Sequence, residues 1–403
     1  MIFDMTKRKG GAPTPTNPVA EDNDVIFIDY DGTIRYSYTK AEFAQLSELP
    51  PNPDHTDMGL VAEGWNWSLA NAKSYVSKYR WLVIGQTYHT ASGAMEIDVE
   101  LRSGRMNPTV GLCVVGTVNI EWGDGTEDTV LTGTSITTAV YASHEYADSG
   151  KYTIRIKNSE GVRSFYRITG HSSNGSLLFC KSSASSINSN MVYHYSVNAI
   201  RLGKLPDNQS NKSLGGDAIK GLGLKYITIP EGYTCPAGTA QHFGSGCMRL
   251  IAWVAPKSCG GPYLLGAAAD NYYVKMLSYP ETASPTSIGY ALRGYQNLKR
   301  LSLPSNITSF GTAGIASCHS LIRLTIPENV TTITSQFSNF GLKELHSTPL
   351  TPPTLGVSLA DCIPDDCIVF VPSSEDHNVL TAYREATNWS TIGSDRIVEE
   401  EAL

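Results

Sequence analysis

Two carboxylates stand two residues apart directly after an apolar run. Residues 25–28 read Val-Ile-Phe-Ile, and Asp29-Tyr-Asp-Gly-Thr33 follows them. Carboxylate side chains can act as nucleophiles or as general acids and bases in catalysis. This motif is therefore where catalysis has to be considered first.

The motif Asp29-Tyr-Asp-Gly-Thr33 resembles the nucleophile motif of haloacid-dehalogenase-type phosphatases. That resemblance implies that Asp29 would attack phosphorus and that Asp31 would act as the acid and base. It also implies a parallel α/β sheet, a later Ser or Thr, a Lys and an acidic pair for Mg²⁺, and these cannot be assembled from the sequence. Thr33 is instead followed by Ile-Arg-Tyr-Ser-Tyr, so that Asp31-Gly32 is also the two-residue turn of a β-hairpin. No Gly-x-Ser-x-Gly, His-Glu-x-x-His or Walker motif occurs. We expect a protein that is not an enzyme and has no cofactor, with a phosphatase as the alternative.

Two further sets of side chains could bind a metal ion. Asp124 and Asp128 could hold a cation, but the backbone geometry of an Asp-Gly turn explains the first of them equally well. Cys235, Cys247 and Cys259 recur every twelve residues, yet no Cys-x-x-Cys is present. We therefore expect no metal site and a ladder of small, buried, reduced cysteines, with zinc as the alternative.

Composition limits the class of protein. The chain has 403 residues, only 17% of them charged, and a net charge of -7, with no basic run beyond Lys7-Arg-Lys9. This length predicts several domains, and the low charge favours strands and turns over helices. We expect a mainly β, multidomain protein that neither grips nucleic acid nor inserts into a membrane. The N-terminus also lacks the apolar segment of a signal peptide.

The N-terminal part divides into an arm and a small module. Residues 1–23 are poor in large apolar groups and predict a flexible arm, whereas residues 24–92 predict a small α/β docking module. After the hairpin, Thr39 and Glu42 form a capping-box pattern, and residues 68–79 have helical spacing. Trp65 and Trp67 could form an exposed binding platform, but we expect them to belong to the core.

Strands dominate residues 93–172. Trp122-Gly-Asp-Gly-Thr126, His144-Glu-Tyr146 and Gly150-Lys-Tyr-Thr-Ile154 resemble, in order and spacing, the PKD domain family. The resemblance implies an Ig-like β-sandwich that serves as a spacer or adhesive module. Alternation along two of the strands predicts these inward side chains: Val118, Ile120, Trp122, Tyr152, Ile154 and Ile156.

A repeat occupies residues 173–360. The pattern apolar-x-x-apolar-x-apolar, usually followed by proline, begins at positions 200, 224, 248, 274, 298, 321 and 342, so its spacing runs 24, 24, 26, 24, 23 and 21. This interval is that of leucine-rich repeats, in which each unit contributes one short strand to a shared core. We therefore predict a solenoid of about seven repeats.

The repeats resemble the BspA-like class of leucine-rich repeats. The run Cys318-His-Ser-Leu-Ile-Arg-Leu-Thr-Ile-Pro-Glu-Asn-Val-Thr-Thr-Ile333 is close to that family's unit. The tail, with Cys367-Ile-Val-Phe-Val-Pro372 and Asn388-Trp389, is similar as well. Residues 361–403 are accordingly expected to form a C-terminal cap, which covers the open end of the solenoid.

Binding by the solenoid would use the strand side chains that point away from its core. These are Tyr226, Thr228, Arg300, Ser302, Arg323, Thr325, Glu344 and His346, called the outward set below. They form either a ligand-binding face or a row of solvated positions.

The order of arm, module, sandwich, repeats and cap resembles proteins encoded by phages and prophages of gut Bacteroidales. Tyr30-Asp-Gly-Thr, Gly64-Trp-Asn-Trp-Ser and Gly85-Gln-Thr-Tyr resemble their N-terminal module. The resemblance implies a virion tail or fibre component that docks on other virion proteins by its N-terminal region and recognises a host-surface glycan or protein. A homotrimer is the assembly that fibres often form. The alternative is a leucine-rich-repeat adhesin of the bacterial cell surface.

Overall fold

A computed structural model describes most of the chain. The described residues are 22–169, 176–179, 186–187, 192–193, 199–202, 212–214, 219–220, 225–234, 251–255, 273–278, 287–288, 294–311, 315–334 and 341–400. The predicted arm, except Asp22 and Asn23, and the predicted cysteine ladder at 235, 247 and 259 lie outside these residues.

The N-terminal module is a four-stranded sheet with helices on one face. Its strands are β1 (Val25–Ile28), β2 (Ile34–Tyr38), β3 (Leu60–Trp65) and β4 (Leu82–Thr90), in the order β2-β1-β4-β3. Its helices are α1 (Lys40–Ala44), α2 (Leu69–Tyr79) and the short η1 (Thr56–Met58). β1 and β2 are antiparallel, which confirms the predicted hairpin. The predicted two-residue turn at Asp31-Gly32 is wrong, because the loop spans residues 29–33 and the Asp29 amide bonds Thr33 O across it. Thr39 and Glu42 form the predicted capping box.

The central strands of this sheet are buried on both faces. On one face Val25 and Phe27 pack with Phe43 of α1 and with Trp65, and Trp67 belongs to the same cluster. The two tryptophans are therefore core residues, as predicted. On the other face Ile26, Ile28 and Val83 pack against Ala252 and Val254, which belong to the repeats.

The next region is antiparallel. Its strands are β5 (Met95–Leu101), β6 (Thr109–Glu121), β7 (Thr129–Thr134), β8 (Val140–Ser143), β9 (Gly150–Lys157) and β10 (Val162–Thr169), with η2 at Ser159–Gly161. The first part of β6 pairs with β8 and β10, and its second part pairs with β7 and β9. Of the predicted inward side chains, five are fully buried and Tyr152 is partly buried against the same core.

The sheet of this region continues into short parallel strands. β11 (Ser176–Phe179) pairs with β5 and with β14 (Ala199–Leu202). On the other side β12 (Ser186–Ile187), β15 (Lys212–Leu214) and β18 (Tyr233–Thr234) extend in turn from β10. A separate pair consists of β13 (Val192–Tyr193) and β16 (Ile219–Lys220).

All seven predicted repeat segments contain a strand. After β14 they are β17 (Tyr226–Thr228), β19 (Ala252–Val254), β20 (Met276–Ser278), β22 (Arg300–Ser302), β24 (Arg323–Ile326) and β26 (Glu344–Ser347). They form parallel sheets in constant register, so that Leu277 lies beside Leu301. A second parallel sheet, which we did not predict, contains β21 (Ser287–Ile288), β23 (Ser309–Phe310), β25 (Thr332–Ile333) and β27 (Thr354–Leu355).

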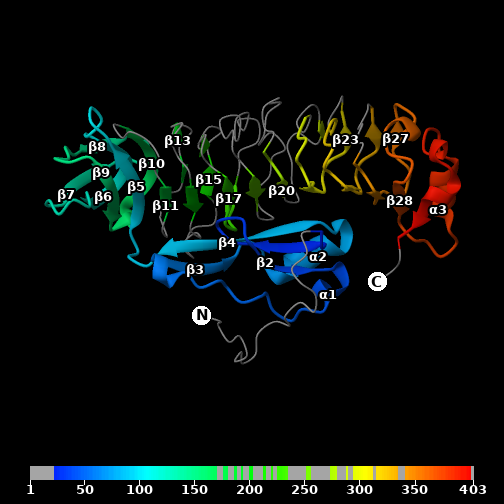
Figure 1. Cartoon of the computed structure of the whole chain (residues 1–403), viewed down its shortest axis with the longest axis horizontal. Coiled ribbons are helices and arrows are strands. Elements are labelled where there is room, and N and C mark those ends of the chain that lie inside the picture. The colour runs from blue at the N-terminus through cyan, green and yellow to red at the C-terminus, as the bar shows by residue number, and fades with distance from the viewer. Residues whose placement is uncertain are drawn as a thin grey trace.

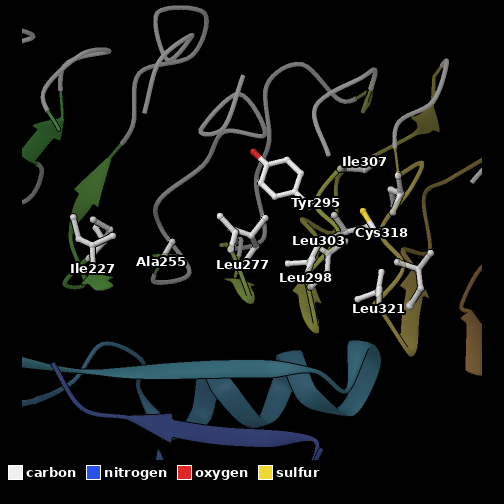
Figure 2. Close-up of a cluster of buried hydrophobic side chains, with 14 of the residues drawn as sticks. Ile227, Ala255, Leu277, Tyr295, Leu298, Leu303, Ile307, Cys318 and Leu321 are labelled. Carbon is white, nitrogen blue, oxygen red and sulfur yellow. The ribbon is translucent and has the colours of Figure 1, made fainter. Parts of the chain in front are cut away.

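Apolar side chains of successive repeats make one continuous core. Leu298, Leu301, Cys318 and Leu321 are all nearly inaccessible to solvent. Figure 2 shows these side chains gathered along the repeats, with the sheet and helix of the module running beside them. Because each unit contributes only a short strand, its apolar side chains are buried by the neighbouring units.

The C-terminal segment first extends the repeat sheet and then turns into helices. β28 (Ile368–Val371) pairs with β26, and β29 (Ile397–Glu399) pairs with β28. Between them lie α3 (Asn378–Glu385), η5 (Ser390–Ile392) and η6 (Ser394–Arg396), after η4 at Leu359–Asp361. Tyr383 and Trp389 are fully buried, and the Trp389 Nε1 donates to Pro353 O over 2.8 Å. Among the described residues no helix is long and apolar enough to cross a membrane.

Candidate functional site: the outward face of the repeat strands

The N-terminal module lies along the outward face of the repeat strands. β4 runs past β14, β17, β19 and β20, and Figure 1 shows the module, in blue, beneath this row of strands. The outward set is therefore brought together on one face, as its spacing predicted. In this structure the face is covered by residues of the same chain.

Two members of the outward set pack directly on glycines of the module. Tyr226 is placed so that a Cβ on Gly32 would lie 2.0 Å from its ring, and a Cβ on Gly85 would lie 2.2 Å from the hydroxyl of Thr228. No side chain larger than hydrogen fits at either position without a shift of the repeat side chain. Gly32 also has a φ of +82°, which a glycine adopts readily.

Asn66 connects the module to two successive repeats. Its Nδ2 lies 3.0 Å from Ile229 O and 3.3 Å from Val254 O, while its Oδ1 accepts a hydrogen bond from the Gly85 amide over 2.9 Å. The neighbouring Trp67 donates from Nε1 to Ala255 O over 3.0 Å. Asn66 is fully buried, so these bonds satisfy backbone carbonyls that water cannot reach.

Hydroxyl groups continue the interface toward the C-terminal repeats. Ser302 donates to Trp81 O, and Thr325 donates to Tyr79 O over 3.1 Å. In the opposite direction the Tyr75 hydroxyl donates to Leu303 O over 3.0 Å. In each case a side chain of one part bonds the backbone of the other part.

Trp81 is surrounded by guanidinium groups. The Arg323 guanidinium carbon lies 4.7 Å from the ring centroid, and those of Arg80 and Arg300 lie 5.9 Å from it. Arg300 and Arg323 also donate to the backbone oxygens of Asn23 and Asp22, the second over 2.7 Å. Cation–π contacts of this kind are stronger when the groups are shielded from water, and Trp81 is almost fully buried.

His346 is the most buried ionisable member of the outward set. Its Nδ1 lies 2.8 Å from a Glu400 oxygen, and its Nε2 lies 3.3 Å from a Glu344 oxygen. The ring stacks on Phe370 with centroids 4.7 Å apart. Arg80 also bonds Glu400, over 2.9 Å, so the network joins the end of α2 to the C-terminal strand.

The charges of this network shift one another's pKa. Burial alone would lower the pKa of His346, but the hydrogen bonds to Glu344 and Glu400 raise it above the ordinary value. The same hydrogen bond from His346, with the charge of Arg323, lowers the pKa of Glu344 to about 2. Burial opposes the shift of Glu400, yet His346 lowers the pKa of that carboxyl as well.

The expectation of a solvated row is wrong for half of the outward set. Arg300, Ser302, Thr325 and His346 are each at least nine-tenths buried. Sequence reasoning did not identify their partners, chiefly Tyr79, Trp81 and Glu400. The unbroken apolar runs 25–28 and 82–84 could have indicated them, since alternation is expected of a sheet with one face in water. Ligand binding by the outward set stays a prediction.

The candidate catalytic residue Asp29 is buried, and hydrogen-bond donors of the protein surround its carboxylate. Tyr88 Oη lies 2.6 Å and the Tyr30 amide 2.8 Å from Oδ1, while His55 Nε2 and the Arg35 guanidinium lie 2.8 Å and 2.7 Å from Oδ2. Burial opposes ionisation, but these donors together lower the pKa of Asp29. Both carboxylate oxygens are thus engaged by groups of the protein.

The two candidate cation ligands, Asp124 and Asp128, contact side chains and backbone groups of the protein. Asp124 accepts bonds from Thr126 and lies 2.6 Å from His144 Nε2, and Asp128 lies 3.2 Å from Lys157 Nζ. The turn interpretation of Asp124 is therefore confirmed. Among the described residues no group of three His, Cys, Asp or Glu side chains could hold a metal ion. Cys113, Cys318, Cys362 and Cys367 are all buried.

Replacing Asn66 by Ala should weaken the attachment of the module. The change leaves the buried carbonyl of Ile229 and the buried amide of Gly85 without the partner that Asn66 supplies, and such unsatisfied groups cost roughly 1 to 3 kcal/mol each. We expect the free energy of unfolding, measured in urea by tryptophan fluorescence, to fall by about 3 kcal/mol. The matched change of the exposed Asn52 to Ala should alter it by less than about 0.5 kcal/mol. Equal effects of the two changes would contradict this role of Asn66.

The His346 network predicts a fall in stability with rising pH. Because the folded pKa of His346 is raised, its charged form stabilises the chain fully below the ordinary value of about 6.5, and this contribution is lost as the pH rises through the folded pKa. The carboxylates stay ionised throughout that window. Urea unfolding from pH 6 to 9 should show a loss of roughly 2 kcal/mol that His346→Gln abolishes and that the exposed His319→Gln retains. Parallel pH profiles for all three proteins would refute the network.

Comparison with known proteins identifies the repeats. Residues 271–350 match the family described as BspA type leucine-rich repeat region, with six copies. They include the strands β20 to β26 and therefore all of the outward set except Tyr226 and Thr228. A search of curated proteins finds no match to the chain. The chain thus contains a BspA-type leucine-rich repeat region within a mainly β, multidomain architecture.

Proposed function

We propose that this chain is a non-enzymatic structural and adhesion protein of a virion, a phage tail or fibre component. The observation that carries the proposal is the BspA-type repeat region at residues 271–350, because such repeats favour a surface or adhesion role. Stacked repeats form a long continuous surface from short repeated units, and such a surface suits the recognition of an extended target. A host-surface glycan or protein is the proposed target.

The two ends of the repeats support a capped solenoid. The PKD-like sandwich would close the N-terminal end, since β5 and β10 supply the strands on which the first parallel strands pair. At the other end, Tyr383 and Trp389 would close the core. Such closure keeps both terminal repeats from exposing apolar core to water.

The docked module determines which surfaces could meet a target. While it is in place, residues 22–85 contact every member of the outward set except Glu344, so recognition would use the remaining surfaces of the repeats and the sandwich. The face of the module that looks away from the repeats, with the residues before Asp22, would dock on other virion proteins. Recognition through the outward set would require the module to leave first.

The environment of Asp29 supports a non-enzymatic role. A nucleophilic carboxylate needs a lone pair directed at its substrate, whereas both oxygens of Asp29 accept bonds from the protein. Asp31 accepts a bond from the Thr33 amide within the hairpin turn. We therefore assign both carboxylates to holding the hairpin and the His55 segment together.

Immunogold labelling of purified phage particles tests the virion proposal. Antibodies against the whole chain should place gold on the tail of intact particles. Gold on the surface of uninfected bacteria, with bare particles, would instead establish the adhesin alternative. Absence from both would refute the proposed surface role.

Substitution of Asp29 tests the non-enzymatic proposal. Asp29→Asn should lower the free energy of unfolding by roughly 2 to 3 kcal/mol, because Arg35 and His55 lose a charged acceptor. The exposed Asp31→Asn should change it much less. The wild-type chain with Mg²⁺ should not hydrolyse p-nitrophenyl phosphate. Hydrolysis that disappears in both variants would establish the phosphatase instead.

A further inference from the structure

The segment from β7 through β8 carries no charge. Residues 129–143 read Thr-Val-Leu-Thr-Gly-Thr-Ser-Ile-Thr-Thr-Ala-Val-Tyr-Ala-Ser, without a single Asp, Glu, Lys, Arg or Pro. Charged residues make up 17% of the whole chain, so a run of this length without one is a distinct local feature. Thr, Val, Ile and Tyr are also the residues that favour strands.

β7 is an open edge of its sheet. Within the described part of the chain it pairs with β6 alone, in an unbroken antiparallel register from Thr129 to Thr134. Its second row of backbone donors and acceptors therefore faces away from the sheet. Proteins usually protect such edges with Lys, Pro or a β-bulge. β7 has none of these.

The outer face beside this edge is also neutral and partly apolar. Val130 is 63% exposed, and Thr132 and Thr134 are exposed with it, while Leu131 points into the core. Ile136 lies in the loop after β7 and is 62% exposed, and Tyr141 lies on β8, which pairs with the other half of β6, and is 47% exposed. Exposed apolar side chains that gather in one region typically mark an interaction surface.

Charge is concentrated on the strands away from the edge. Arg155 of β9 lies 3.0 Å from Glu96 and 2.9 Å from Glu121, and Lys157 lies 2.8 Å from Glu121. The usual arrangement, with charges at the edge and fewer in the middle, is thus reversed on this sheet. A partner that approached β7 would meet no charged group on the strand itself.

We propose that the β7 edge pairs with the β7 edge of a second copy of this chain, antiparallel and about a twofold axis. The partner must offer an open strand edge of matching length without charge, and β7 is itself such an edge. With a net charge of -7, two copies repel one another over most of their surface, but not along residues 129–143. A twofold contact of this type is self-complementary and closes at two chains.

The place of β7 in the molecule permits this contact. Figure 1 shows β7 and β8 at the end of the molecule opposite α3, clear of the N-terminal module. Two chains could therefore join end to end by a sheet that runs from one sandwich into the other. Hydrogen bonds between the two backbones would supply the affinity of this contact. The neutral side chains would supply its selectivity for a second copy of the chain.

Sedimentation velocity over a concentration series tests the contact with the full chain. The wild type should shift from one chain of 43.6 kDa toward twice that mass as its concentration rises. Thr132→Lys and Thr132→Glu should each stay monomeric, because like charges would meet across the axis. An equimolar mixture of the two variants should form the dimer again. Ser103→Lys, an exposed change away from the edge, should dimerise like the wild type.

A second measurement covers the case in which the Thr132 variants do not fold. Amide hydrogen exchange of residues 129–134 in the wild type should become faster on dilution, while exchange in β9 stays constant. A wild type that remains monomeric, a trimeric mass, or dimers that persist in folded Thr132→Lys would each overturn the proposal. Because the mass is measured on the isolated chain, the result does not depend on whether the chain belongs to a virion.

Discussion

The central strands of the N-terminal module are apolar on both faces, and a sheet of this kind is stable only when both faces are covered. β1 reads Val-Ile-Phe-Ile and β4 begins Leu-Val-Ile, and all of these side chains are buried. The helices of the module cover one face, and the repeat strands cover the other with Ala252, Val254 and Met276. The attachment of the module thus follows from the hydrophobic effect acting on a second, unsolvated face.

Polar groups then determine where the module sits on the repeats. Apolar contact alone determines poorly where one sheet sits along another, because the hydrophobic effect has no preferred direction. Asn66, Ser302 and Thr325 bond particular backbone carbonyls across the interface, and Gly32 and Gly85 admit Tyr226 and Thr228. Each such bond adds little net stability, but a shift by one repeat would leave several buried polar groups unpaired. The interface therefore has one favourable position.

The buried charges show how the interface between the module and the repeats can depend on pH. His346 lies between two carboxylates at the junction of the repeats, the module and the C-terminal strand, and their hydrogen bonds raise its pKa above the ordinary value. Asp29, by comparison, lies inside the module among four donors and stays ionised under ordinary conditions. Both sites hold segments together, and neither geometry leaves the carboxylates directed at a substrate.

The sequence alone determined the periodic features. A spacing of 21 to 26 residues placed a strand in each of seven repeats, and alternation identified inward side chains such as Val118 and Ile120. Turn-forming residues between two strand-like runs indicated the β1–β2 hairpin, although not the length of its loop. These features are local, since each follows from neighbours within one turn, strand or repeat. The sequence also identified the outward set, because side chains alternate along a strand. It did not show that Asn66 and Trp81, far away in the chain, cover that face. Only the tertiary structure decided this, because the face of a sheet can be covered by any apolar surface, and periodicity carries no information about which distant segment supplies it.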